Sequence, residues 1–175
     1  GCDGARIRLA PEKDWPSNKG LGQALSLLAP VKAHFGAKLS WADLIVIAGS
    51  AAAADSGVSG ITLTAGRTDA ADGSGSEDLK PAPLKTSGDL KRRMQSMGLT
   101  LEEGTALMAA GHLRVRQVSR DGYTGSATTN PGKLTGEYFR SLLKEKWDSS
   151  SGTWTTKCRR IMDSNCFMVK EAANK

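Results

Sequence analysis

The chain has 175 residues and a formal net charge of +6, and 39% of its residues are hydrophobic, 5% aromatic and 24% charged. This length fits one domain with a buried core, and the composition excludes a collagen, a disulfide-rich scaffold and a wholly disordered chain. The scarcity of aromatic residues argues against a base-stacking surface for single-stranded nucleic acid.

The first predicted helix runs from about Leu21 to Phe35, because apolar residues recur there at steps of three and four. Ser17 or Asn18 is expected to cap its start, and Gly36 is expected to end it. Pro30 predicts a kink or a break within this helix, since proline lacks the backbone N–H that the helix needs.

A second helix is predicted to open at Ser40, with Asp43 in its first turn near the positive end of the helix dipole. Its run from Leu44 to Ala54 is apolar on nearly every side, which predicts a central, buried helix ended by Gly57 and Gly60. This is the longest apolar stretch of the chain, and it has about half the length that a bilayer requires. No transmembrane span is therefore expected.

The remaining segments predict an all-α fold with one long irregular loop at about 61–87. Short helices are expected at Asp89–Met97, before Gly98, and after a capping box formed by Thr100 and Glu103. The later predictions are helices at Lys133–Trp147 and at about Arg159–Ala173, and a hairpin or loop at 148–157.

Charge is spread unevenly: residues 40–82 are net acidic, and the segments 1–39, 85–120 and 137–175 are net basic. A basic face suits an acidic protein, anionic lipid or nucleic acid, and an ordinary solvated surface is the plainer interpretation. The run Lys91–Arg93 is too short to indicate a nucleic-acid arm. Cys2, Cys158 and Cys166 are an odd number without metal-ligand spacing, which favours a reducing, intracellular setting.

Six segments occur in a characteristic order, and they are Gly1–Arg8, Pro16–Leu21, Leu39–Gly49, Gly66–Ala70, Glu103–His112 and Asn130–Phe139. This succession resembles class I haem peroxidases, the group of ascorbate peroxidase, cytochrome c peroxidase and the catalase-peroxidases. The resemblance covers essentially the whole chain. Leu113–Val115, Trp154–Thr156 and Asp163–Asn165 make it closest to the C-terminal half of catalase-peroxidases, a duplicated peroxidase fold that has lost its haem and has a structural role.

The resemblance implies a haem-peroxidase-like helical fold that is partial, because the family's distal helix with its Arg and His precedes the segment at which this chain begins. That helix lies upstream or is lacking, so the expected unit is a single domain over 1–175 within a longer chain or processed precursor. The family's distal Asn, which orients the distal His, matches Asn18. A helix cap is the alternative interpretation of Asn18, which is otherwise a vestigial distal-side residue.

The proximal side departs from the family's pattern. The iron ligand of active relatives follows a motif that Ala106–Ala110 matches, but the next residue here is Gly111, and His112 comes one place later. One residue turns a helix by about 100°, so His112 would ligate haem iron only if the helix ended early or bulged. The carboxylate that supports the ligand falls near Lys157, where a cation would lower the basicity of an imidazole.

These departures favour a degenerate, non-catalytic peroxidase-fold domain, a pseudoenzyme that serves as an accessory subunit of a larger assembly. No cofactor, no metal and no confident catalytic residue is expected; the alternative is a haem b peroxidase that reduces hydrogen peroxide in oxidative stress, with His112 as ligand. The expected partner is a protein with an acidic surface, not nucleic acid, and peripheral contact with a membrane complex is a further expectation. The expected setting is an organelle, a plastid or mitochondrion.

Overall fold

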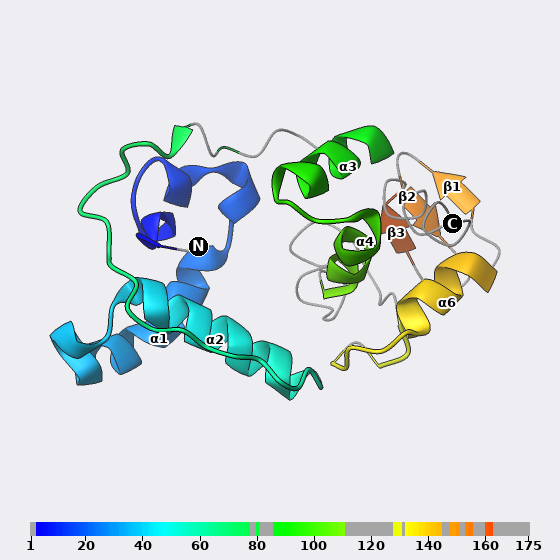
Figure 1. Ribbon diagram of the computed structural model, residues 1–175. Coiled ribbons are helices and arrows are strands. Elements are labelled where there is room, and N and C mark those ends of the chain that lie inside the picture. Colours follow the sequence, from blue (N-terminus) through cyan, green and yellow to red (C-terminus); the bar gives the residue numbers. More distant parts are fainter. Residues whose placement is uncertain are drawn as a thin grey trace. The chain divides into compact units, whose positions relative to one another are not determined.

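The structure is a computed structural model (Figure 1), and it describes residues 3–77, 80, 86–110, 128–130, 132–144, 148–150, 153–155 and 160–162. The chain divides into two compact units, Gly1–Ala82 and Pro83–Lys175, and each is described by itself. The single domain expected over 1–175 stays a prediction. Helices predominate in the described residues, in agreement with the expected all-α class, and one small sheet accompanies them.

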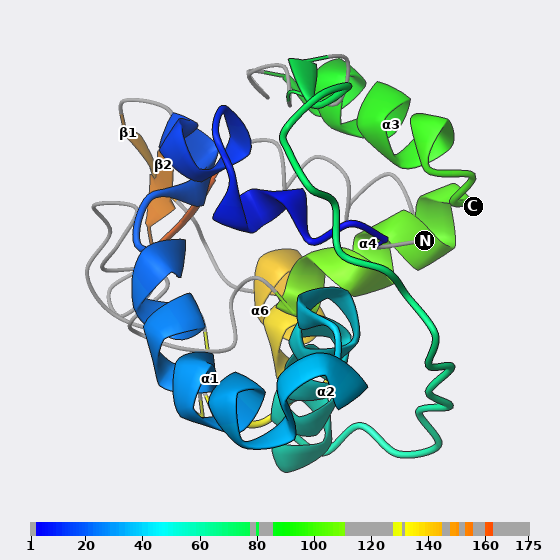
Figure 2. The ribbon, with the colours of Figure 1, turned by 90° about the vertical axis from the view of Figure 1, so that its left-hand side faces the viewer.

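The first unit places three short 3-10 helices before a pair of longer helices. Its elements are η1 (Arg6–Arg8), η2 (Glu12–Asp14), η3 (Pro16–Asn18), α1 (Leu21–Phe35), η4 (Gly36–Lys38) and α2 (Trp41–Asp55). Helices α1 and α2 contact one another and lie side by side in both views (Figures 1 and 2). Ile7 of η1, in the N-terminal segment, lines a pocket together with residues of both helices.

The predicted cap of helix α1 is wrong, because neither Ser17 nor Asn18 caps it. Gly20 takes the N-cap position with a φ of +87°, a left-handed conformation that glycine adopts without strain. The side chain of Asn18 instead donates a hydrogen bond to the backbone carbonyl of Glu12, which precedes it in the sequence. At the other end Gly36 closes the helix as expected, because its N–H donates to the carbonyl of Lys32.

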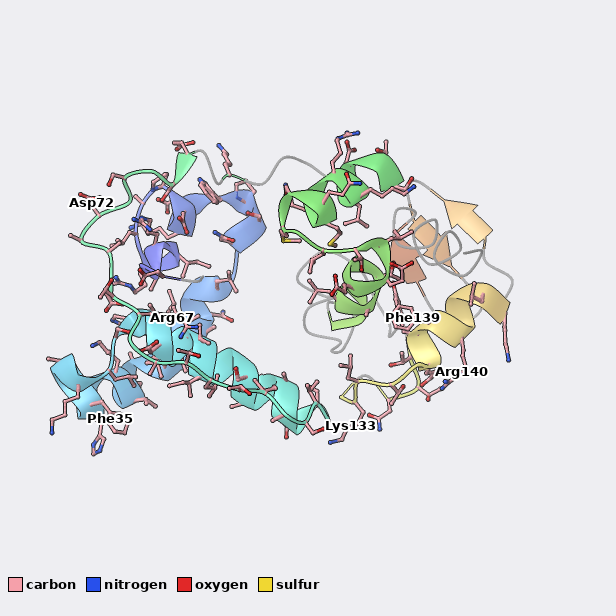
Figure 3. All side chains as sticks on the ribbon, viewed as in Figure 1. Phe35, Arg67, Asp72, Lys133, Phe139 and Arg140 are labelled. Carbon is pink, nitrogen blue, oxygen red and sulfur yellow. The ribbon has the colours of Figure 1, made fainter. Side chains whose placement is uncertain are left out.

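Of the kink or break predicted at Pro30, the break is wrong, because α1 continues through Pro30 to Phe35. Pro30 is exposed, and water can therefore serve the carbonyl one turn earlier that loses its usual N–H partner. The outer end of the helix carries Phe35, which is 48% exposed and labelled in Figure 3.

Helix α2 begins as expected, because Ser40 Oγ accepts a hydrogen bond from the backbone N–H of Asp43 at 3.0 Å. Its burial differs from the expectation of a central helix. Only Ala42, Asp43 and Leu44 are buried, and Ile47 is 40% exposed. The apolar run therefore continues onto a surface that the described residues leave uncovered.

The segment after α2 is irregular, as predicted for 61–87, over the part of it that the structure describes. It returns to the N-terminal segment, where the N–H of Gly4 donates to the carbonyl of Thr68 and the N–H of Ala70 donates to the carbonyl of Gly4, both at 2.8 Å. Asp3 adds a bond from the Thr68 N–H at 2.7 Å. These bonds hold the long loop against the start of the chain.

The second unit contains α3 (Ser87–Ser96), α4 (Leu101–Ala110) and α6 (Glu137–Lys144). Thr86 and Asp89 form a capping box at α3, and Gly98 follows its end with a φ of +75°. The predicted box at α4 is present, since the Thr100 N–H donates to Glu103 at 2.9 Å. The box at α4 is the predicted one, whereas the box at Thr86 starts α3 two residues before the predicted Asp89.

The C-terminal predictions are partly wrong. Helix α6 begins at Glu137 and not at Lys133, because residues 132–136 form turns, a bend and irregular backbone before it, and the N–H of Glu137 donates to Thr135 Oγ1 at 3.3 Å. Strands β1 (Asp148–Ser150) and β2 (Thr153–Thr155) make the hairpin expected as one option. Strand β3 (Arg160–Met162) pairs antiparallel with β2, so the predicted helix at Arg159–Ala173 is wrong there, and 163–173 lie outside the described residues.

Candidate functional site

Asn18 ends η3, and its side chain is fixed by a bond to the preceding 3-10 helix. Its Nδ2 donates to the backbone carbonyl of Glu12 at 2.8 Å. The amide is therefore oriented through its donor end, and its Oδ1 keeps its acceptor capacity with no partner in the part of the chain that the structure describes. An acceptor held in this way suits an incoming N–H group.

Glu12, which holds Asn18, is itself held from far along the sequence. Ser76 Oγ donates to Glu12 Oε1 at 2.8 Å, and Ser76 is fully buried. The N–H of Ser76 also bonds the carbonyl of Gly73 at 3.2 Å, which closes a turn in the long loop. The loop end thus supports the segment that orients the Asn18 amide.

A second polar cluster joins α2 to the Gly66–Asp69 segment. The carboxylate of Asp43 accepts from the Gly66 N–H at 2.8 Å and from Arg67 Nη1 at 3.0 Å. The Gly66 hydrogen bond, together with the adjacent Arg67, lowers the pKa of the Asp43 carboxyl, and partial burial opposes this effect. Asp43 is therefore ionised and holds the loop in place.

Asp69, which is not part of α2, binds the first backbone N–H groups of that helix. Its two carboxylate oxygens accept from the N–H groups of Trp41 and Ala42, each at 2.9 Å. These N–H groups are among those that a helix leaves without internal partners, and a carboxylate is the favoured partner there. This helix end is consequently filled by the chain itself and offers little to an external anion.

An apolar pocket of about 360 Å³ lies between η1, α1 and α2. Its described lining consists of aliphatic residues and one glycine, and these residues are Ile7, Leu21, Ala24, Leu25, Leu27, Leu28, Ile45, Ala48 and Gly49. No side chain in this described lining is ionisable or able to hydrogen-bond. The pocket suits an apolar occupant and offers no group for general acid–base chemistry.

The described residues do not fit a haem-iron site. The chain has two histidines, and the described one, His34, lies exposed on the last turn of α1 with its ring 4.9 Å from that of Phe35. The described pocket lining holds no imidazole, thiolate or carboxylate that could bind iron. Within the described residues no three His, Cys, Asp or Glu side chains gather as a metal site. His112, Gly111 and Lys157 lie outside the described residues.

The sequence singled out Asn18 as a candidate site residue but did not indicate the residues that orient its side chain. Glu12 and Ser76 are 64 positions apart, and no periodicity or local motif links them. The segment Gly66–Ala70 did stand out as part of the family resemblance, but its role as the partner of α2 appears only from the Asp43 and Asp69 bonds. The helical pattern identified the lining residues of α1 and α2 as apolar, but it did not predict that they surround a pocket.

Comparison with known proteins gives a consistent result. A family model described as peroxidase matches residues 1–168. A catalase-peroxidase of Pseudomonas putida (strain W619) is 36% identical over 87% of this chain and 24% of its own length, and one of Pseudomonas entomophila is 38% identical over 82% and 22%. A third, from Phenylobacterium zucineum, is 37% identical over 91% and 26%. The chain therefore spans about a quarter of the length of these relatives.

Proposed function

The chain belongs to the peroxidase family, and from this membership we propose that it is a non-catalytic, structural domain of that family within a larger protein assembly. The observation that carries the proposal is the exposure of α1. None of its 15 residues is buried, and Leu27 is 80% exposed. Apolar surface of this kind on a folded chain is typical of a protein contact.

The sequence supports the non-catalytic part of the proposal. Gly111 stands where the family resemblance implies the iron ligand, and Lys157 stands near the position of the carboxylate that would support it. Loss of both removes the two groups that bind and tune haem iron in a peroxidase. The proposed partner has an acidic surface that complements the basic segments 85–120 and 137–175, and the proposed setting is an organelle such as a plastid or mitochondrion.

The part of the chain that the structure describes has no helix long and apolar enough to cross a bilayer. Contact with a membrane complex is therefore proposed through a protein partner and not through a helix of the described part of this chain.

A second candidate function is a haem peroxidase that reduces hydrogen peroxide, and the Asn18 geometry favours it. The amide is oriented by Glu12 with Oδ1 kept as an acceptor, which suits the role that the resemblance implies for this position, the orientation of a distal histidine. In this alternative His112 binds the haem iron. The Asn18 amide would then have a proton-relay partner outside the described residues.

Haem titration of the full chain separates the two functions. The structural proposal expects no stoichiometric Soret band after reconstitution with hemin, because the iron ligand is lost. The variants His112→Ala and His34→Ala form a matched pair, since these are the two histidines of the chain. A one-to-one band that disappears in His112→Ala and persists in His34→Ala would establish the peroxidase alternative and overturn the structural one.

A further inference from the structure

The apolar pocket between η1, α1 and α2 shares Leu27 with the exposed α1 surface assigned to a partner, but Leu25, Leu28 and Ile45, which also line it, are half-buried. We propose that it is a binding site for a small, uncharged, apolar molecule, such as a hydrocarbon ring or a short alkyl chain. Leu25, Leu28 and Ile45 line it from the two helices, and Ile7 lines it from η1. Burial of apolar ligand surface against these side chains supplies the binding energy.

The charge of the surroundings selects an uncharged molecule. The described lining offers no polar side chain, and the sequence has no ionisable residue from Leu21 to Val31 or from Leu44 to Ala54. A charged group placed here would lose its hydration without gaining a partner, which is strongly unfavourable. Water is a poor occupant for the same reason, because a trapped water needs polar partners.

The size of the pocket suits a small molecule. The pocket holds about 360 Å³, which lies in the range of small-ligand sites. A hydrocarbon ring or a short alkyl chain fits within this volume.

Gly49 allows the pocket to be closed by substitution. A Cβ added at Gly49 meets no described atom within 4 Å, and Gly49 lines the pocket, so we expect a larger side chain at this position to take up pocket space. Leucine also has a higher helix propensity than glycine, and the helix should persist. Gly22 provides the matched control, because its Cβ is equally unobstructed but it lies on α1 outside the described lining.

The test is a methyl NMR titration of the full chain with toluene, with benzoate as its charged analogue. Toluene is expected to shift the methyl signals of Leu25 and Ile45 and to saturate. Benzoate is expected to bind at least tenfold more weakly, because its carboxylate finds no partner in the pocket. Shifts that never saturate, or equal binding of benzoate, would overturn the proposal.

The variants locate the site. Gly49→Leu is expected to weaken toluene binding at least tenfold, and Gly22→Leu is expected to keep it within twofold of the unmodified chain. Ala24→Leu, on the opposite wall, is a second blocking variant should Gly49→Leu perturb the fold. Undiminished binding in a folded blocking variant would contradict the assignment. So would pocket signals that shift with protein concentration alone, since a second copy would then be the occupant.

Discussion

Asp43 combines the start of a helix with the anchoring of a distant loop. Its backbone N–H donates a hydrogen bond to Ser40 Oγ, the cap of α2. Its carboxylate accepts hydrogen bonds from the Gly66 N–H and from Arg67 Nη1. The carboxylate is thus useful only when it is ionised, because a protonated acid accepts these bonds less strongly. The anchoring of residues 66–69 should therefore depend on pH.

We predict the direction of this dependence from the pKa of Asp43. The pKa of Asp43 is lower in the folded chain than in the unfolded chain, where it is about 3.9. The stabilisation of the folded state by the ionised carboxylate is therefore fully present above that pH. It is lost as the pH falls from about 4 toward the lower folded pKa. Asp43→Asn should melt below the unmodified chain at pH 7, and the difference should shrink as the pH falls below about 4.

Thermal melts followed by circular dichroism between pH 3 and pH 7 test this prediction. Asp14→Asn is the control, because Asp14 is exposed and its side chain has no hydrogen-bond or ion-pair partner among the described residues. It should leave the melting temperature nearly unchanged at every pH. A difference between Asp43→Asn and the unmodified chain that stays constant down to pH 3 would contradict the role of the ionised carboxylate.

At the scale of elements, α3 and α4 approach closely because one of them presents a glycine. A Cβ added at Gly104 would lie 2.7 Å from Met94 Cγ and 3.1 Å from Met94 Cβ. Met94 and Leu90 are the buried centre of this contact, and Leu99 and Leu101 pack against them. The spacing of the two helices therefore depends on the absence of a side chain at position 104.

Gly104→Ala should lower the free energy of unfolding by up to about 2 kcal/mol. Overpacking costs about 1–3 kcal/mol, and the higher helix propensity of alanine returns about 1 kcal/mol of it. Gly88→Ala on α3 is the matched control, since its added Cβ would make only ordinary contacts at 3.6 Å. Urea denaturation measures both variants. Equal stability of Gly104→Ala and Gly88→Ala would show that the contact adjusts freely.

At the scale of the whole molecule, several large apolar side chains of the described residues are exposed and not part of a buried core. Val31 is 40% and Phe35 48% exposed on α1, and Leu107 is 53% exposed on α4. Each of the two compact units therefore carries exposed apolar side chains of its own. Such a chain gains stability from a neighbour that covers the apolar side chains.

We predict that the isolated chain self-associates or packs loosely and that polar substitutions on α1 relieve this. The double variant Val31→Gln/Phe35→Gln should stay monomeric at higher concentration and lose less than about 0.5 kcal/mol of stability, since both residues lie at the surface of α1 and outside the buried core. Size-exclusion chromatography and thermal melting test both statements. Leu44→Gln is the contrasting variant and should unfold the first unit, because Leu44 is 4% exposed. A sharp melt from a clean, unmodified monomer at high concentration would contradict the prediction.

The sequence alone determined the features that depend on neighbouring residues. The caps of α2, α3 and α4 follow from side chains three residues apart, and Gly36 and Gly98 end helices through conformations that favour glycine. The helical class and the resemblance to peroxidases follow from the order of such local segments, and the family match confirms it. The predicted start of α6 at Lys133 was wrong, because turn residues precede the helix at Glu137.

Only the tertiary structure decided the features that join distant residues. The apolar pattern of α2 predicted burial at Ile47, but a pattern states which residues avoid water and not which neighbours exclude it. The Asn18 position was visible in the sequence, whereas its orientation depends on Glu12 and on Ser76, 64 residues beyond Glu12. Strand β3 replaced a predicted helix because pairing with β2 overrides a weak local preference.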